Sequence, residues 1–196
     1  MWYNGFLKNN FEKTSGLPRK VSHLYILRHQ LTANFVTDCH RVQERIMQTF
    51  LPYPDLADSV ICLDNKRLGK QRVEAMQILN VLEGRRDGWK NHPAVKMWTG
   101  HTDCLHLYKD LCITEWIDRG FNNTMDYTSR YMAPDINISR LTRNPKNSAW
   151  NPLFPEWWGG DIHATHRSNL LRKDADHYSQ FGWNESDDLP YHWPTV

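Results

Sequence analysis

The 196 residues are enough for one domain with a modest core and leave little room for a second. The formal net charge of +2 is too small to indicate nucleic-acid binding by itself. Residues 1–46 hold seven basic and three acidic side chains, so residues 47–196 carry 17 basic and 19 acidic side chains. Four cysteines without CxxC spacing exclude a disulfide framework, and no apolar run approaches the roughly 20 residues that would span a membrane.

Residues 1–46 are predicted to be an N-terminal extension, because their pattern does not continue into the segment that begins at Met47. The first residues lack the charged start, apolar stretch and small-residue cleavage site of a secretory signal. We therefore expect an intracellular, cytoplasmic protein. We also expect Met47 to be an alternative natural start, with residues 47–196 as the functional domain.

From Asp55 onward the pattern is mostly helical, which predicts an all-α fold with a single compact helical domain and a long irregular C-terminal loop region. A short helix capped by Asp55 is predicted to reach about residue 63. A longer helix is predicted from residue 64 or 65 to Glu83, closing at Gly84. On a 100° wheel its apolar side chains fall within one sector, which we expect to be buried: Leu68, Ala75, Ile78, Leu79 and Leu82.

A third helical region is predicted to begin at Pro93, since proline is tolerated in the first turn of a helix, and to end by Gly120. Gly100 could divide it. Its expected buried side chains are Val95, Trp98, Leu105, Tyr108, Leu111, Cys112 and Ile117. Residues 121–160 are rich in Asn, Pro, Ser and Thr and are predicted to form a long ordered loop. Helix returns at Asp161–Lys173, followed by an aromatic, acidic tail.

Basic residues gather between Asp64 and Lys96, where eight stand against four acids. The eight are Lys66, Arg67, Lys70, Arg72, Arg85, Arg86, Lys90 and Lys96. A looser group follows at Arg130, Arg140, Arg143 and Lys146. Such a run is often only a solvated helix face. The alternative is phosphate binding, for which Lys66, Arg67 and Arg72 are candidate ligands.

Lys70 and Glu74 lie four residues apart, so they share one helix face. An amine can attack a sugar carbon and form a Schiff base, and a nearby carboxylate can stabilise the cationic intermediate or move the sugar's proton. An ordinary surface ion pair has the same spacing. The spacing therefore proposes Lys70 and Glu74 as catalytic residues without deciding between the two interpretations.

The tripeptide Asn91-His92-Pro93 lies where a basic loop enters a helix. Backbone N–H groups and an imidazole in that position can hold an anion, which makes Asn91 and His92 candidate phosphate contacts. A capping role for His92 is the alternative.

The helix at Asp161–Lys173 supplies three more candidate phosphate contacts, His166, Arg167 and Arg172. His163 and His166 also form an HxxH pattern. Zinc sites normally need three or four protein ligands, and no further ligand lies at a supporting spacing, so we expect no metal and no other cofactor. Structural hydrogen bonding is the alternative for His163.

Several ordered blocks resemble the pyrimidine dimer DNA glycosylase family, the endonuclease V type of UV-repair enzyme found in bacteria and bacteriophages. They are FLPYPDLADSVICLDNKRLGKQRVEAMQIL, GWKNHPAVKMW, HATHRSNLLRKDADHY and DDLPYHWP, within residues 47–194. The resemblance implies an all-α domain that binds duplex DNA containing damaged or modified pyrimidines and flips a base out. It implies excision of the damaged pyrimidine and AP-lyase nicking through a Schiff base, without a metal. We expect a monomer and no membrane partner.

The resemblance places the family's basic and acidic helix on Arg67, Lys70, Arg72 and Glu74, with Glu74 matching the catalytic carboxylate. The best-understood bacteriophage enzyme uses its own N-terminal α-amine, whereas this chain begins 46 residues before the matching segment. The nucleophile is then the amine of Met47 in a chain that starts there, or Lys70, or the glycosylase activity is absent. The alternative functions are a non-catalytic module that binds distorted or modified DNA and a metal-dependent nuclease using the HxxH histidines.

Overall fold

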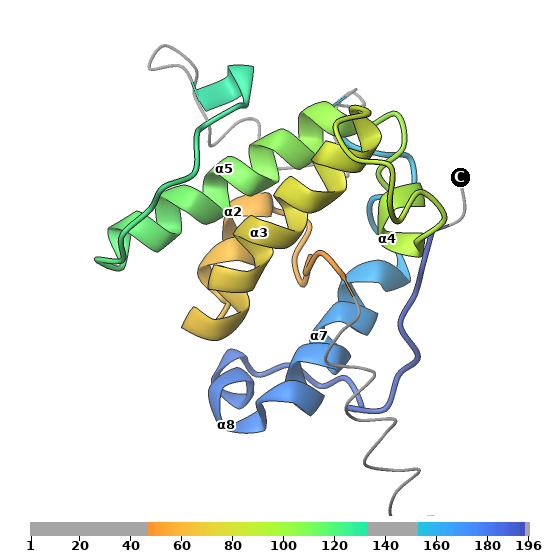
Figure 1. Cartoon of the computed structure of the whole chain (residues 1–196). Helices are drawn as coiled ribbons and strands as arrows, with labels where there is room; N and C mark the ends of the chain where they lie inside the picture. Colours follow the sequence, from red (N-terminus) through yellow and green to blue (C-terminus); the bar gives the residue numbers. More distant parts are fainter. Residues whose placement is uncertain (1–46, 133–152, 195–196) are drawn as a thin grey trace, which may run out of the picture. The chain divides into compact units, whose positions relative to one another are not determined.

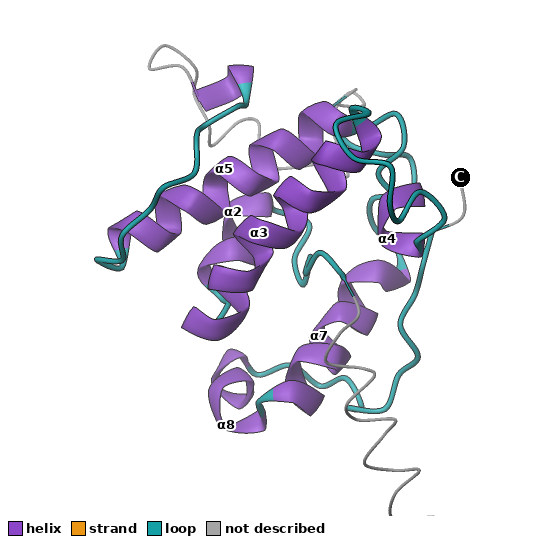
Figure 2. Ribbon diagram, in the orientation of Figure 1, coloured by secondary structure: helices purple, strands orange, loops and turns teal. Residues whose placement is uncertain are grey.

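The computed structural model describes residues 47–132 and 153–194. The chain separates into two units at residue 46, and every described residue lies in the second, Met47–Val196. The expected N-terminal extension and residues 133–152 lie outside the described part, and with them Cys39, Arg140, Arg143 and Lys146. The described residues form helices and loops without a β-strand (Figure 2), which confirms the all-α prediction.

Aspartate caps begin the first two helices, and the first of them, Asp55, was predicted. Helix α2 (Leu56–Ile61) follows Asp55, and helix α3 (Asn65–Leu82) follows Asp64. Each carboxylate accepts two of the backbone N–H groups that a helix start leaves unpaired. At the other end of α3, Gly84 has φ +73°, a conformation that glycine adopts without steric cost.

Helix α4 (Pro93–Lys96) and helix α5 (Thr102–Asp118) form the third helical region. They are separate because Gly100, at φ +80°, turns the chain between them. Most of the predicted apolar face is buried, but the prediction was wrong for Ile117, which is 42 % exposed. Ile117 lies in the last turn of α5, where neighbouring elements no longer cover that side.

Helices α3 and α5 pack against each other across the core (Figure 1). Gly69 permits the close approach, because a Cβ at that position would lie 2.9 Å from the ring of Trp116. The same ring stacks on Phe121 with centroids 4.2 Å apart, and the guanidinium of Arg72 lies 4.1 Å from its centroid. Trp116 therefore joins the two long helices to the loop that follows α5.

The C-terminal part contributes helix α7 (Asp161–Lys173), helix α8 (Ala175–Tyr178) and the short 3-10 turns η1 (Arg130–Met132) and η2 (Ser179–Phe181). The bounds of α7 match the prediction. Beyond η2 the tail runs back past α7 to α4, where Trp193 meets His92 (Figure 1). Three cysteines are buried and free, as expected of small apolar residues: Cys62, Cys104 and Cys112. No helix in the described ranges is long and apolar enough to cross a membrane.

Candidate active site

A non-helical segment, residues 47–52, is buried at the start of the described chain (orange in Figure 1). Buried backbone groups need hydrogen-bond partners, and here side chains supply them in place of a neighbouring strand. The Gln71 amide of α3 accepts from the Phe50 N–H (2.9 Å) and donates to the Gln48 carbonyl (3.0 Å). Tyr108 of α5 donates its hydroxyl to the Phe50 carbonyl (2.9 Å) and to Gln71 Oε1 (2.8 Å). Both long helices thus hold the segment.

The two histidines of the HxxH pattern hold the next residue, Leu51. The Leu51 N–H donates to His166 Nδ1 at 2.7 Å, and His163 Nδ1 lies 2.7 Å from the Leu51 carbonyl, where it must donate. Burial holds the pKa of His166 well below its ordinary value, so this imidazole is neutral and can accept the backbone N–H. The geometry gives both Nδ1 atoms a structural partner. Among the described residues no group of three or more His, Cys, Asp or Glu side chains could hold a metal ion.

Glu74 lies beside residues 47–52, the clamped segment, and is only 5 % exposed. Its carboxylate accepts from Gln71 Nε2 (2.9 Å) and from the backbone N–H of Gln48. The Lys70 ammonium lies 3.3 Å from Glu74 Oε1, with its side chain 46 % exposed. Because the carboxylate is buried and the amine reaches solvent, the pair differs from an ordinary surface ion pair.

The net effect of these surroundings is a raised pKa for Glu74. Burial is the largest cause, and the Lys70 charge and the hydrogen bonds from Gln48 and Gln71 act against it. A carboxylate whose pKa moves toward neutrality is better suited to accept and return a proton during a reaction. The site therefore combines a buried carboxylate of raised pKa with a primary amine 3.3 Å away.

The C-terminal tail closes the other side of the segment. Tyr191 donates its hydroxyl to the Thr49 carbonyl (3.1 Å), and its ring stacks on His166 with centroids 4.7 Å apart. Trp98 Nε1 donates to Thr49 Oγ1 at 3.1 Å. Burial, and then the Glu74 charge, raise the pKa of Tyr191 well above its ordinary value.

The candidate phosphate ligands on α3 differ in how available they are. Lys66 is exposed in the first turn. The Arg67 guanidinium is paired with Asp174 (3.1 Å) and Asp64 (3.3 Å). Arg72 is half-buried over Trp116 and donates to Asn123 Oδ1 at 3.0 Å. Lys66 is thus open to an anion, whereas the two arginines are held by partners inside the protein.

The remaining candidates are spread over other elements. Asn91 is exposed, and His92 caps α4, since its Nδ1 accepts from the Ala94 N–H at 3.1 Å. Arg167 donates to Glu185 Oε1 (2.5 Å) and to the Pro52 carbonyl (2.7 Å), and Arg172 donates to the Asp187 carbonyl (2.9 Å). His166 is fully buried and presents no surface to a phosphate. The structure therefore brings Met47, Lys70 and Glu74 together but not the whole set of candidate phosphate ligands.

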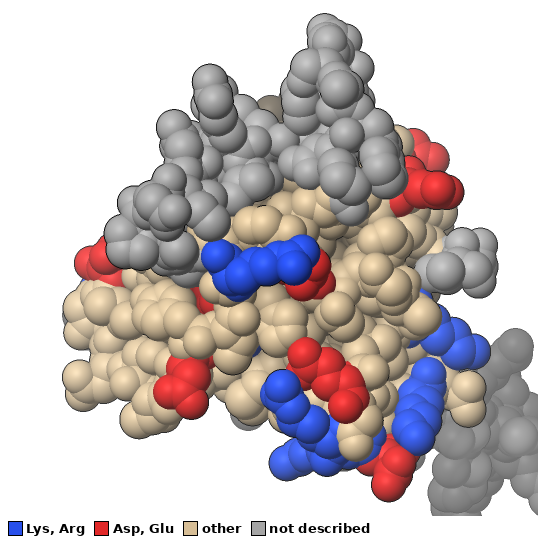
Figure 3. All heavy atoms as spheres, turned by 90° about the horizontal axis from the view of Figure 1, so that it is seen from above, with Lys and Arg blue, Asp and Glu red and all other residues tan. Residues whose placement is uncertain are grey.

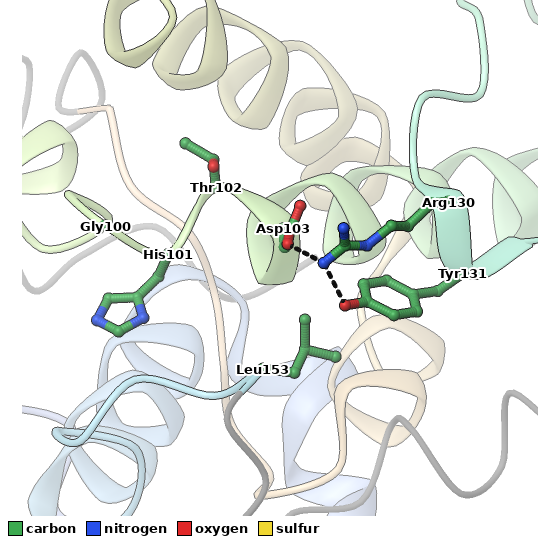
Figure 4. Close-up of a pocket in the computed structure, with 7 residues that line it drawn as sticks. All are labelled: Gly100, His101, Thr102, Asp103, Arg130, Tyr131 and Leu153. Atoms are coloured by element: carbon green, nitrogen blue, oxygen red, sulfur yellow. Dashed lines mark hydrogen bonds and ion pairs between the residues drawn. The ribbon is translucent and has the colours of Figure 1, made fainter.

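The surface charge is mixed. On the face shown in Figure 3, lysines and arginines lie next to acidic side chains and do not form one continuous basic patch. A hollow of ≈ 180 Å³ lies apart from Glu74, between the start of α5 and η1 (Figure 4). Arg130 crosses it, bonded to Asp103 (2.5 Å) and to the Tyr131 hydroxyl (2.9 Å). None of the candidate catalytic residues lines this hollow.

A family model described as pyrimidine dimer DNA glycosylase matches residues 47–129. The match begins with the clamped segment and includes Lys70 and Glu74. The matched residues are fewer than half of the chain, and over them the chain is similar to the pyrimidine dimer DNA glycosylase family. No curated protein and no solved structure matches the chain. The family match confirms the resemblance over residues 47–129 and indicates a glycosylase that acts on pyrimidine dimers in DNA. The two resembling blocks that follow residue 129 lie outside the match.

The sequence analysis did not identify three side chains that hold residues 48–50 beside Glu74. Gln71 and Tyr108 lie within the segment that matches the glycosylase family, and Tyr191 lies after it. Gln71 lies three residues before Glu74 on the same helix face, and that spacing was a usable signal. The tyrosines gave no signal of their own, because their partners are backbone groups of residues 49 and 50, which are distant in sequence.

Proposed function

We propose that this chain excises pyrimidine dimers from duplex DNA and then nicks the strand by an associated AP-lyase activity. The observation that carries the proposal is the buried Glu74 carboxylate, held by the Gln48 N–H and paired with the Lys70 amine, within the segment that matches the glycosylase family. We expect the protein to act as a monomer in the cytoplasm.

The chemistry assigns separate steps to the amine and the carboxylate. The damaged nucleotide turns out of the duplex so that its sugar can reach the site. The neutral amine attacks C1′, and the electron pair of the bond to the base goes to the departing pyrimidine, which takes up the proton that the amine nitrogen loses. The C1′–O4′ bond then breaks, the ring oxygen takes up a proton, and C1′ and the amine nitrogen are left as a protonated Schiff base. Glu74 then takes a proton from C2′, and the electron pair of that C–H bond drives cleavage of the C3′–oxygen bond, which releases the 3′ side of the strand as a phosphate.

The nucleophile depends on where the polypeptide begins. In the 196-residue chain the Gln48 nitrogen is an amide, so we assign the attack to Lys70, whose Nζ lies 3.3 Å from the carboxylate that can accept its proton. In a chain that starts at Met47, the α-amine is one residue away from the N–H that bonds to Glu74. That amine is then the nucleophile, and Lys70 holds a phosphate.

Phosphate contacts come from exposed side chains at the two ends of α3 and just before α4. We assign them to Lys66, Arg86 and Asn91, which are exposed. Arg67, Arg72, Arg167 and Arg172 would reach DNA only by exchanging their partners inside the protein, and His92 by giving up its cap. We assign His166 to holding Leu51, which fixes the clamped segment beside Glu74.

The decisive experiment is borohydride trapping on duplex DNA with a single abasic site, and on UV-irradiated duplex DNA. The wild-type chain should form a covalent adduct and nick the strand. Glu74→Gln should abolish nicking while DNA affinity stays nearly intact, because the amide keeps the shape but cannot take the proton. Lys70→Ala should abolish the adduct of the 196-residue chain. Lys96→Ala, which removes an exposed lysine of α4, is the matched control and should change neither.

Mass spectrometry of the trapped peptide identifies the amine directly. An adduct on Lys70 supports the assignment for the full chain, and an adduct on the N-terminal peptide of a Met47-start form supports the α-amine. If both forms bind damaged DNA but neither forms an adduct or nicks the strand, the protein is a non-catalytic DNA-binding module and the proposed enzyme activity is wrong.

A further inference from the structure

The loop between α3 and α4 carries an unusual tryptophan. Trp89 is 60 % exposed, and its φ of +70° lies in a region that side chains other than glycine rarely adopt. The turn is closed by a hydrogen bond from the His92 N–H to the Trp89 carbonyl at 2.8 Å. A strained backbone that presents a large apolar ring to solvent needs a reason, and function is a common one.

Packed rings support the indole from behind. Trp89 lies against His92 (centroids 5.3 Å apart), His92 against Trp193 (6.0 Å), and Trp193 against Tyr191 (4.4 Å). Tyr191 in turn donates a hydrogen bond to the Thr49 carbonyl. Thr49 follows Gln48, whose N–H bonds to Glu74. Figure 1 shows the same neighbourhood, with the tail ending beside the loop that precedes α4. The exposed indole is therefore fixed in place and connected to the site by a short series of contacts.

Cationic side chains flank the indole within the loop. Arg86 and Lys90 are exposed, and Lys90 pairs with Asp87, whose side chain is almost fully exposed. Arg85 is exposed and paired with Glu83. A planar apolar ring between exposed cations is the arrangement that suits a nucleic acid, since the cations can meet phosphates and a ring can stack on any base.

We propose that Trp89 enters the base stack of the duplex at the position from which the damaged nucleotide is extruded. The proposal rests on the glycosylase function proposed above and adds the residue that stabilises the opened duplex. Extrusion toward a buried carboxylate leaves a gap between base pairs, and apolar wedges commonly fill such gaps. Trp89 is thus a positioning residue that acts on the DNA and not on the reacting atoms.

The test measures the preference of the full chain for an opened duplex. Two labelled duplexes of identical sequence are compared by fluorescence anisotropy, one with a tetrahydrofuran abasic analogue and one intact. The wild-type chain should prefer the abasic duplex. Trp89→Ala should lower affinity for the abasic duplex by about tenfold while affinity for the intact duplex stays unchanged, since one stacked ring contributes on that order. Trp89→Phe should keep most of the preference.

Ile61→Ala is the matched control, because Ile61 is 58 % exposed at the end of α2 and its removal should affect binding to neither duplex. A second readout is 2-aminopurine placed next to the abasic position, whose fluorescence the wild-type indole should quench and Trp89→Ala should not. A preference that survives in Trp89→Ala would overturn the wedge and leave the glycosylase proposal standing. An equal loss on both duplexes would overturn it too, by making Trp89 a general contact. A wild-type chain that binds neither duplex would overturn both proposals.

Discussion

Glu74 and Lys70 share one helix face, yet one side chain is buried and the other is nearly half exposed. The difference arises because the clamped segment covers Glu74 and supplies the Gln48 N–H, whereas Lys70 lies one turn earlier, toward solvent. A carboxylate in that position keeps its charge only at a cost, since burial disfavours the ionised form. That cost has a measurable consequence for stability.

The raised pKa of Glu74 predicts that this residue destabilises the fold as pH rises. Below the ordinary pKa of glutamate both the folded and the unfolded chain carry the neutral acid, and the effect is absent. Between that value and the raised folded pKa the unfolded chain ionises first, so stability falls, and above the folded pKa the loss is complete. Urea unfolding should therefore show the Glu74→Gln chain gaining stability relative to wild type as pH rises from the ordinary pKa of glutamate to the raised pKa of folded Glu74.

Glu156→Gln is a suitable control for that measurement, because Glu156 is exposed. A constant difference between wild type and Glu74→Gln over the whole pH range would show that the carboxylate is not buried as described.

Helix α5 holds the loop that follows it through a buried ion pair. Asp110 is fully buried, and its Oδ2 accepts from the backbone N–H groups of Thr128 (2.8 Å) and Ser129 (2.5 Å). Lys109 pairs with Asp110 Oδ1 (3.0 Å) and donates to the Asp126 carbonyl (2.7 Å). The returning loop is thus fixed to the helix by charge-assisted hydrogen bonds.

Asp110→Ala is predicted to cost about 3–5 kcal/mol, because it leaves the Lys109 charge buried without its partner. Urea unfolding measures the loss, and hydrogen exchange at Thr128 and Ser129 should accelerate. Asp103→Ala removes a carboxylate of the same helix that pairs with Arg130 at the surface, and the unfolding midpoint should hardly move. Equal losses of stability for the two substitutions would contradict the role given to Asp110 in holding the loop after α5.

At the scale of the molecule, charge is spread and not concentrated. Residues 47–196 carry two more acidic than basic side chains, and the face in Figure 3 mixes both signs. DNA affinity must then depend on a few phosphate contacts. Each contact releases counterions, which contributes about 0.9 to the slope of log affinity against log salt concentration.

Lys66→Gln and Arg86→Gln should each reduce the magnitude of that slope by about 0.9 and weaken binding equally for damaged and intact duplexes. Arg130→Gln, whose guanidinium is paired with Asp103, should leave the slope unchanged. Titrations at several salt concentrations measure all three slopes. A slope that neither of the first two substitutions changes would remove both residues from the interface.

The sequence by itself determined the local structure and the family. Asp55 and Asp64 stand where helix starts need a cap, Gly84 and Gly100 stand where helices must end, and the spacing of Lys70 and Glu74 puts an amine and a carboxylate on one face. These are short-range effects that a few neighbouring residues settle. The expected DNA glycosylase function came from the sequence blocks that resemble the family.

Only the tertiary structure decided which of these groups are buried and what they contact. Gln71, Tyr108, Tyr191 and the two α7 histidines meet residues 48–51 from distant parts of the chain. That convergence buries Glu74, makes His166 a structural group and leaves Trp89 exposed. Burial and hydrogen-bond partners depend on long-range packing, which no local pattern specifies, and the reactivity of the site depends on both.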